Sequence, residues 1–119
     1  MYSAAVLDHF KNPRNTGDLS DATAVVEATN PVCGDILRLA ARVDTEVIVE
    51  CRFKAQGCVT ALACASVLTE LVTGKSLDQA RNSTAAQISE ALGGLPQATF
   101  HAAQLATDAL GALLAKLSG

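Results

Sequence analysis

The segment Asn30-Pro31-Val32-Cys33-Gly34-Asp35 joins two stretches of the chain in which apolar and polar side chains alternate. Proline and glycine favour a turn at this place, because proline restricts the backbone and glycine adopts conformations that other residues avoid. The segment also carries a thiol and a carboxylate two residues apart, and Gly34 allows the backbone to bend so that both reach one metal ion. Two interpretations stay open at this point: a metal-binding loop, or an ordinary turn with an incidental buried cysteine.

Alternation on both sides of this segment predicts three strands. The first is expected over residues 22–29, and the second and third are expected to form a hairpin joined by a tight turn at Asp44-Thr45. One face of this hairpin is expected to be covered. Its side chains would be Leu37, Leu39, Ala41 and Val43 from one strand, and Val47, Val49, Cys51 and Phe53 from the other.

Helical spacing of apolar residues predicts one helix before the strands and several after them. The first helix, residues 2–11, is expected to make its apolar contacts through Val6, Leu7 and Phe10. Later helices are expected over residues 59–73, from residue 76, over residues 84–92 and over residues 99–117. This order predicts an α+β fold in a single domain, residues 1–119: a three-stranded antiparallel sheet with helices packed mainly on one face.

Composition and charge argue against several classes of function. The net charge is −3 and no run of Lys or Arg occurs, whereas a nucleic-acid-binding protein needs a clustered basic face. No stretch approaches the roughly 18 apolar residues of a membrane span, and the N-terminal residues lack the positive charge of a signal peptide. Four cysteines in such a chain are expected to be thiols or metal ligands rather than disulfides. A cytoplasmic location is expected, with neither nucleic acid nor a membrane as partner.

Four side chains are candidates for one metal site. Cys33 and Cys58 each lie beside a glycine at the end of a predicted strand, and the hairpin between them can bring both thiols to the same end of the sheet. Asp35 is close to the first thiol, and His101 lies near the start of the last helix. Two sulfur atoms, one nitrogen and one oxygen form a reasonable tetrahedral set for zinc and a partial set for iron, although the spacing matches no zinc-finger pattern.

The remaining cysteines and histidine are expected to be structural. Cys51 lies on the apolar face of its strand and is interpreted as core. Cys64 follows Cys58 by roughly 240° around a helix of 3.6 residues per turn, so one ion cannot easily contact both. His9 is expected to be a surface or cap residue. A catalytic alternative, with Cys58 as nucleophile and His101 as base, has no recognisable oxyanion-forming feature to support it.

Several motifs in the right order make the whole chain resemble one family, the U-type iron–sulfur cluster assembly scaffolds (IscU and the N-terminal domain of NifU). Residues 30–35 are similar to the first cysteine motif of this family, and residues 53–58 are similar to the second. The other similar segments are Tyr2-Ser3, Asp8-His9-Phe10, Asn12-Pro13-Arg14-Asn15, Gly17, Thr69-Glu70, Gly74-Lys75-Ser76-Leu77, Leu95-Pro96 and Phe100-His101.

The resemblance implies a small α+β scaffold that is not an enzyme. Such proteins accept sulfur from a cysteine desulfurase, bind iron, assemble a [2Fe–2S] cluster and pass it to recipient apo-proteins. Carried over to this sequence, their site comprises Cys33, Asp35, Cys58, His101 and position 102. Position 102 is alanine here, where the family has its third cysteine, and this weakens the implied partnership with a desulfurase.

Two departures from the family, the alanine at position 102 and a changed chaperone motif, lead to an alternative function. The family's chaperone-recognition motif Leu-Pro-Pro-Val-Lys is replaced by Leu95-Pro96-Gln97-Ala98-Thr99, which argues against chaperone docking. Iron–sulfur clusters are usually held by four thiolates, whereas two thiolates, a carboxylate and an imidazole suit Zn²⁺. The alternative is a zinc-binding module that has lost cluster assembly and acts as a regulator or docking partner of the assembly machinery.

Overall fold

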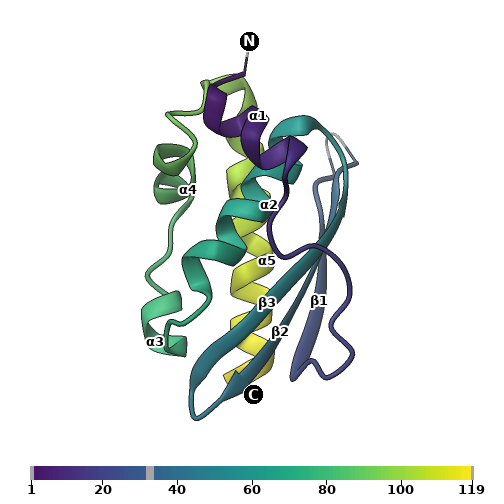
Figure 1. Ribbon diagram of the computed structural model, residues 1–119, viewed down its shortest axis with the longest axis vertical. Coiled ribbons are helices and arrows are strands. Elements are labelled where there is room, and N and C mark those ends of the chain that lie inside the picture. The colour runs from purple at the N-terminus through teal and green to yellow at the C-terminus, as the bar shows by residue number, and fades with distance from the viewer. Residues whose placement is uncertain (1, 32–33, 119) are drawn as a thin grey trace.

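The computed structural model describes residues 2–31 and 34–118, in the order helix, three strands and further helices (Figure 1). The elements are α1 (Ala4–Lys11), β1 (Ala24–Thr29), β2 (Ile36–Asp44), β3 (Val47–Gln56), α2 (Val59–Val72), α3 (Leu77–Ala80), α4 (Ala85–Ala91), the 3-10 helix η1 (Gln97–Thr99) and α5 (Phe100–Ser118). None of the helices in these residues combines the length and apolar character that crossing a membrane requires.

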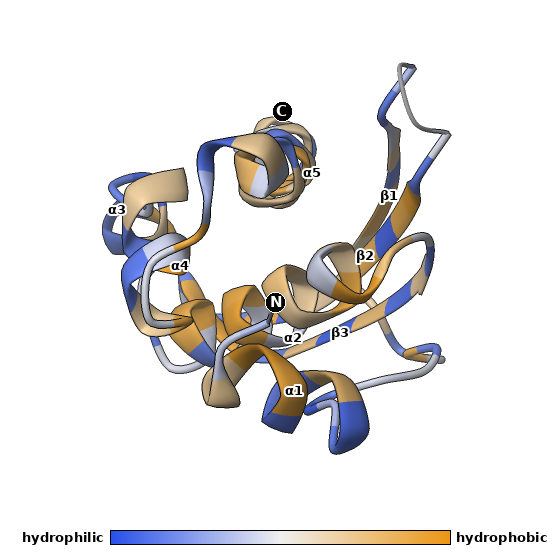
Figure 2. Ribbon diagram, turned by 90° about the horizontal axis from the view of Figure 1, so that it is seen from above, coloured by the Kyte–Doolittle hydropathy of each residue, from blue (hydrophilic) through white to orange (hydrophobic). Residues whose placement is uncertain are grey.

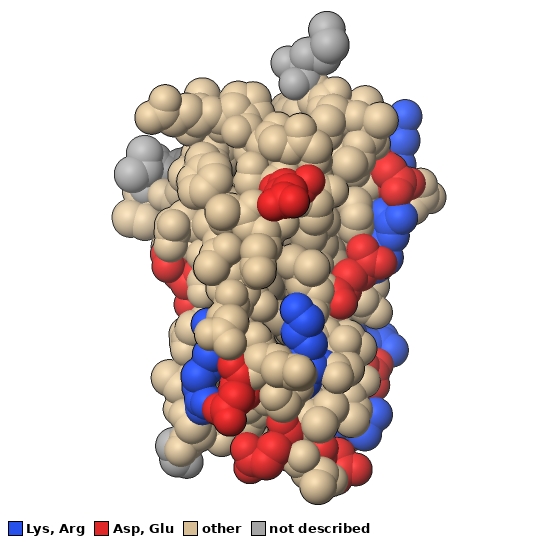
Figure 3. Space-filling model, turned by 90° about the vertical axis from the view of Figure 1, so that its left-hand side faces the viewer, with Lys and Arg blue, Asp and Glu red and all other residues tan. Residues whose placement is uncertain are grey.

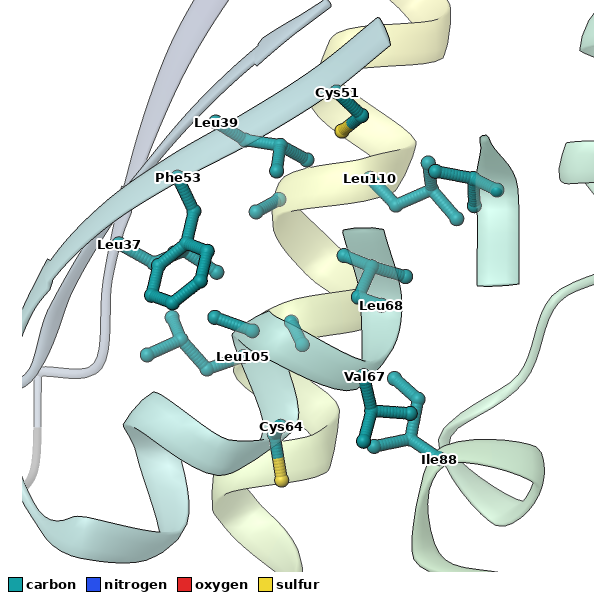
Figure 4. Close-up of a cluster of buried hydrophobic side chains, with 14 of the residues drawn as sticks. Leu37, Leu39, Cys51, Phe53, Cys64, Val67, Leu68, Ile88, Leu105 and Leu110 are labelled. Carbon is teal, nitrogen blue, oxygen red and sulfur yellow. The ribbon is translucent and has the colours of Figure 1, made fainter. Parts of the chain in front are cut away.

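The three strands form one antiparallel sheet in the order β1-β2-β3. Helices α2 and α5 cover one face of it, and α1 lies on the outer side of α2 (Figure 2). Buried side chains of the sheet, such as Leu39 and Phe53, meet Leu68 of α2 and Leu105 of α5 between these layers (Figure 4). Burial of this apolar surface is the main favourable contribution to folding. The predicted α+β fold, with helices mainly on one face, is confirmed.

Strand β3 does not alternate along its whole length as predicted. Its pairing with β2 shifts by one residue between Arg42 and Val43, which leaves Val49 as an extra residue on β3. Val49 is 37 % exposed, and Ile48 is fully buried in its place. A β-bulge of this kind reverses which residues face inward beyond it. The prediction was therefore right for Cys51, which is buried, and wrong for the start of the strand.

The turn between β2 and β3 lies one residue later than predicted. Asp44 and Val47 form the last pair of the hairpin, and Thr45 and Glu46 make the turn with φ angles of 55° and 65°. Two positive φ angles in a two-residue loop are typical of a type I′ turn, whose twist matches that of the strands. Neither residue is the asparagine or glycine that usually marks such a turn, so the sequence contained no local signal for its position.

Several charged side chains on the surface lie next to partners of opposite sign. On the uncovered face of the sheet, Arg52 Nε donates to Glu50 at 2.7 Å and Lys54 Nζ donates to Asp18 at 3.2 Å. On the face drawn in Figure 3, acidic and basic side chains lie beside one another in the lower part, whereas one acidic group in the upper part stands alone.

Helix α1 buries less apolar surface than predicted. Val6 is buried, but Leu7 and Phe10 are 37 % and 39 % exposed. The helix has eight residues and lies outside α2, so only one side of it contacts the rest of the protein (Figure 2). The prediction of three apolar contacts holds fully only for Val6.

His9 attaches α1 to α2, so the prediction of a surface or cap residue was wrong. Its Nδ1 lies 2.8 Å from Oγ of the buried Ser66, and its Nε2 lies 3.5 Å from Oε1 of Glu70. The backbone N–H of Arg14 donates to the same Ser66 oxygen at 2.9 Å. Ser66 follows His9 by 57 residues, which is why no local pattern indicated this contact.

We expect the stability of the protein to depend on the protonation of His9. Burial, followed by the charge of Arg14, lowers the pKa of His9 below its ordinary value of 6.5. The unfolded chain therefore binds this proton more readily than the folded protein does. The contribution of His9 to the free energy of unfolding should be complete above pH 6.5 and should be lost as the pH falls below that value.

Urea unfolding of the wild type and of His9→Gln, between about pH 7.5 and about pH 5, measures this effect. The stability advantage of the wild type should shrink as the pH falls. His101→Gln is the matched control, because that histidine is exposed and is not among the described hydrogen-bond partners of Ser66. An advantage that stays constant over the whole pH range would contradict the prediction.

Candidate metal centre

Three side chains with metal-binding atoms meet where β2 begins and β3 ends. They are Asp35, Cys58 and His101, and one possible ligand atom of each lies within 4.8 Å of those of the other two. Asp35 directly precedes β2, Cys58 follows β3, and His101 is the second residue of α5. Three of the four predicted ligands therefore lie together, and the fourth, Cys33, is outside the described residues.

The loop before β2 holds Asp35 in a buried position. The N–H of Asn30 donates to the carbonyl oxygen of Asp35, and the N–H of Gly34 donates to the carbonyl oxygen of Asn30, both at 2.8 Å. Gly34 has a φ angle of 75°, in the left-handed region that glycine adopts without strain. Asp35 is only 6 % exposed. A buried carboxylate is costly unless it is paired with a cation or hydrogen-bond donors, so this position favours a cation nearby.

Cys58 is the N-cap of α2. Its sulfur accepts a hydrogen bond from the N–H of Ala61 at 3.4 Å, and its thiol donates to Oδ2 of Asp35 at 3.6 Å. The positive end of the helix dipole faces the sulfur and favours a negatively charged atom there. Because Cys58 is also exposed, a metal ion or a partner can reach it.

His101 and its neighbour Ala102 differ in their surroundings. His101 is exposed at the start of α5, next to the centre, whereas Ala102 is 1 % exposed and packs in the core. An alanine side chain has no atom that can bind a metal. Position 102, where the resemblance implies a cysteine, therefore contributes no ligand in this chain.

Cys51 and Cys64 do not belong to the centre. Both are buried among apolar side chains (Figure 4), and burial raises the pKa of each thiol to about 12. A thiol with such a pKa stays protonated at neutral pH and is a poor nucleophile and metal ligand. The interpretation of both as core residues is confirmed.

One residue of the centre, Gly57, was not identified from the sequence. It follows β3 directly, and the side chain of Asp35 lies against it. A glycine beside a cysteine is common in turns. Only the distance across the two strands shows that this glycine contacts a candidate ligand.

The donor atoms are a sulfur, a carboxylate oxygen and an imidazole nitrogen. Sulfur and nitrogen suit zinc and iron, and the carboxylate is a harder ligand that both metals also accept. The chemistry of the described side chains therefore fits a zinc ion, an iron ion or the iron of a cluster.

Several known proteins are similar to this chain. Residues 1–119 match the family model described as NifU-like N terminal domain. The chain is 46 % identical over 111 residues to the iron-sulfur cluster assembly scaffold protein IscU of Aquifex aeolicus, which covers 92 % of this chain and 71 % of that protein. It is 42 % identical over 120 residues to the protein of the same name from Escherichia coli (strain K12). This match covers 96 % of this chain and 91 % of that protein.

A solved structure agrees in fold. The N-terminal part of a nitrogen-fixing NifU-like protein from Brucella abortus matches with a TM-score of 0.74, covering 97 % of this chain and 92 % of that one. Its sequence identity is 18 %, so this match speaks for the fold alone. The resemblance inferred from the motifs is confirmed by the family model and by the relatives.

The environments of the described cysteines predict which of them react. Iodoacetamide added to the native protein at about pH 8 is expected to modify Cys58 and to spare Cys51 and Cys64. With a pKa of about 12, about one buried thiol in ten thousand is ionised at that pH. Peptide mass mapping reports each cysteine separately, and protein unfolded in urea is the control in which all should react. Modification of Cys51 or Cys64 in the native protein at the rate of Cys58 would contradict this.

Proposed function

Since this chain belongs to the NifU-like N-terminal domain family, we propose that it is an iron–sulfur cluster assembly scaffold or carrier, with iron or a [2Fe–2S] cluster as its cargo. The ligands in this proposal are Cys33, Asp35, Cys58 and His101. The observation that supports it most is that three of these side chains, from separate elements, bring ligand atoms within 4.8 Å of one another. The names of the relatives support the kind of cargo.

The mixed set of ligands suits a cargo that has to be released again. Clusters that stay in a protein are usually held by four thiolates. Asp35 and His101 bind iron through oxygen and nitrogen, which are harder donors than sulfur and exchange more readily with the thiols of a recipient. Cys58 and His101 are exposed, so a recipient apo-protein can approach the cargo directly.

Sulfur reaches this centre, in our proposal, as a persulfide of a cysteine desulfurase. Ala102 cannot accept it, and Cys58 is the exposed thiol at the centre in the described part of the chain. The thiolate of Cys58 attacks the outer sulfur of the desulfurase persulfide, and the desulfurase cysteine leaves as a thiolate. This step moves one sulfur atom to Cys58 and changes no oxidation state overall.

The geometry favours binding and transfer over catalytic turnover. The catalytic alternative needs His101 within hydrogen-bond reach of the Cys58 thiol, so that it can act as the base. The thiol of Cys58 donates to Asp35 at 3.6 Å, and no hydrogen bond joins it to His101 among the described residues. We therefore propose a protein that is not an enzyme.

A zinc-binding module is the second candidate function. The alanine at position 102 favours it, because this alanine removes a thiolate from the set that a cluster prefers. Zinc accepts four ligands of these types, and the candidates here are Cys33, Asp35, Cys58 and His101. Such a protein would regulate the assembly machinery or dock to it, without building clusters.

Anaerobic reconstitution tests the first candidate. Wild-type protein incubated with ferrous iron, cysteine and a cysteine desulfurase is expected to gain visible absorption bands and acid-labile sulfide. Cys58→Ser should lower the cluster content by about tenfold or more, because it removes a thiolate ligand. Cys64→Ala is the matched control, since it removes a thiol that is fully buried and does not belong to the group of possible ligands. A colourless wild-type protein would exclude the scaffold function.

The variant Ala102→Cys separates the two candidates. A scaffold should assemble a cluster as wild type and should transfer it more slowly to an apo-ferredoxin after gaining a thiolate at position 102. A zinc module should assemble a cluster only in the variant, if at all. Sulfide content and transfer rate are measured for both proteins, and thermal unfolding shows whether the buried position accepts the larger side chain.

A further inference from the structure

Asp35 and Gly57 touch across the end of the β2–β3 pair. The pair Ile36–Gln56 is the last one in this ladder, and Asp35 and Gly57 are the next residues on the two strands. A methyl group on Gly57 would lie 2.6 Å from both Cγ and Oδ1 of Asp35, and 3.0 Å from its Cβ. Ordinary van der Waals contacts are 3.4 to 4 Å long, so no side chain fits at position 57 while Asp35 stays where it is.

Glycine is needed at this position for space and not for backbone conformation. The glycines with a positive φ angle in the described chain do not include Gly57, so other residues can adopt its backbone angles. Gly57 has the carboxylate of Asp35 against it, and the thiol of Cys58 donates to that carboxylate. The carboxylate thus occupies a gap that exists because residue 57 has no side chain.

We propose that Gly57 is a positioning residue of the metal centre: because it has no side chain, the Asp35 carboxylate lies beside Cys58, where both reach one ion. This inference rests on the metal-binding function proposed above. A side chain at position 57 pushes the carboxylate away by rotation about the Asp35 side-chain bonds. The two strands can stay in place, because their pairing involves backbone groups.

Zinc alone is a suitable probe of this arrangement. Its dissociation constant is measured by competition with a chromophoric chelator for the wild type, Gly57→Ala, Asp35→Ala and the double variant. Gly57→Ala should weaken zinc binding by about 10- to 100-fold, the usual effect of disturbing a residue that orients a ligand. In the Asp35→Ala background the same change should have no further effect, because the carboxylate it displaces is gone.

Gly111→Ala is the matched control, since Gly111 is a glycine of α5 with nothing within 4 Å of an added methyl group. It should bind zinc like the wild type. Wild-type affinity in Gly57→Ala would overturn the inference and leave the proposed function intact. An equal loss in the presence and absence of Asp35 would also overturn it, because the effect would then not act through the carboxylate.

A measurement without metal keeps the two proposals apart. The side-chain carboxyl carbon of Asp35 has an NMR resonance that reports its surroundings in the metal-free protein. This resonance should move in Gly57→Ala and stay in place in Gly111→Ala. If the wild type binds neither zinc nor iron, the proposed function fails. The change in the Asp35 carboxyl resonance then still tests whether Gly57 determines the position of Asp35. An unchanged resonance in Gly57→Ala overturns that role.

Discussion

Burial of the inner face of the β2–β3 hairpin beneath α2 and α5 determines the rest of the structure. Leu39 and Phe53 face the helices only in one register, because a slip by one residue turns every side chain of a strand to the opposite face. The same register makes Asp35 the residue opposite Gly57 and brings the chain to Cys58 at the start of α2. The candidate metal centre is therefore placed by apolar packing of residues that do not belong to it.

Much of the fold could be predicted because its signals are local. Alternation and helical spacing predicted the order of the elements, and the motifs around Cys58 and His101 indicated candidate ligands, which the structure places together with Asp35. The errors arose where the structure depends on residues far apart in the chain. The bulge at Val49 depends on pairing with β2, the role of His9 depends on Ser66 on another helix, and the role of Gly57 depends on a distance across two strands. Local periodicity contains none of these contacts.

The centre combines rigid and accessible parts. Asp35 is buried and tied into its loop by backbone hydrogen bonds, while Cys58 and His101 are exposed at the starts of two helices. Family membership establishes the fold that positions these side chains. Any conclusion about the chemistry of the site has to be argued from the donor atoms themselves. The alanine at position 102 matters for this reason: it is buried in the core and has no atom that can bind a metal, so it adds no donor atom to the candidate centre.

The separation of the described cysteines into one exposed thiol and two core thiols limits what oxidants can do to the protein. Oxidation of cysteine follows exposure and thiolate character. The thiol of Cys58 is exposed to solvent, whereas those of Cys51 and Cys64 are buried, and burial keeps them protonated at neutral pH. Among these three thiols, oxidation is therefore expected to begin at Cys58, the candidate ligand, and to leave the core thiols intact. If it stops at a sulfenic acid or a disulfide, a cellular reductant can restore the same molecule without refolding it.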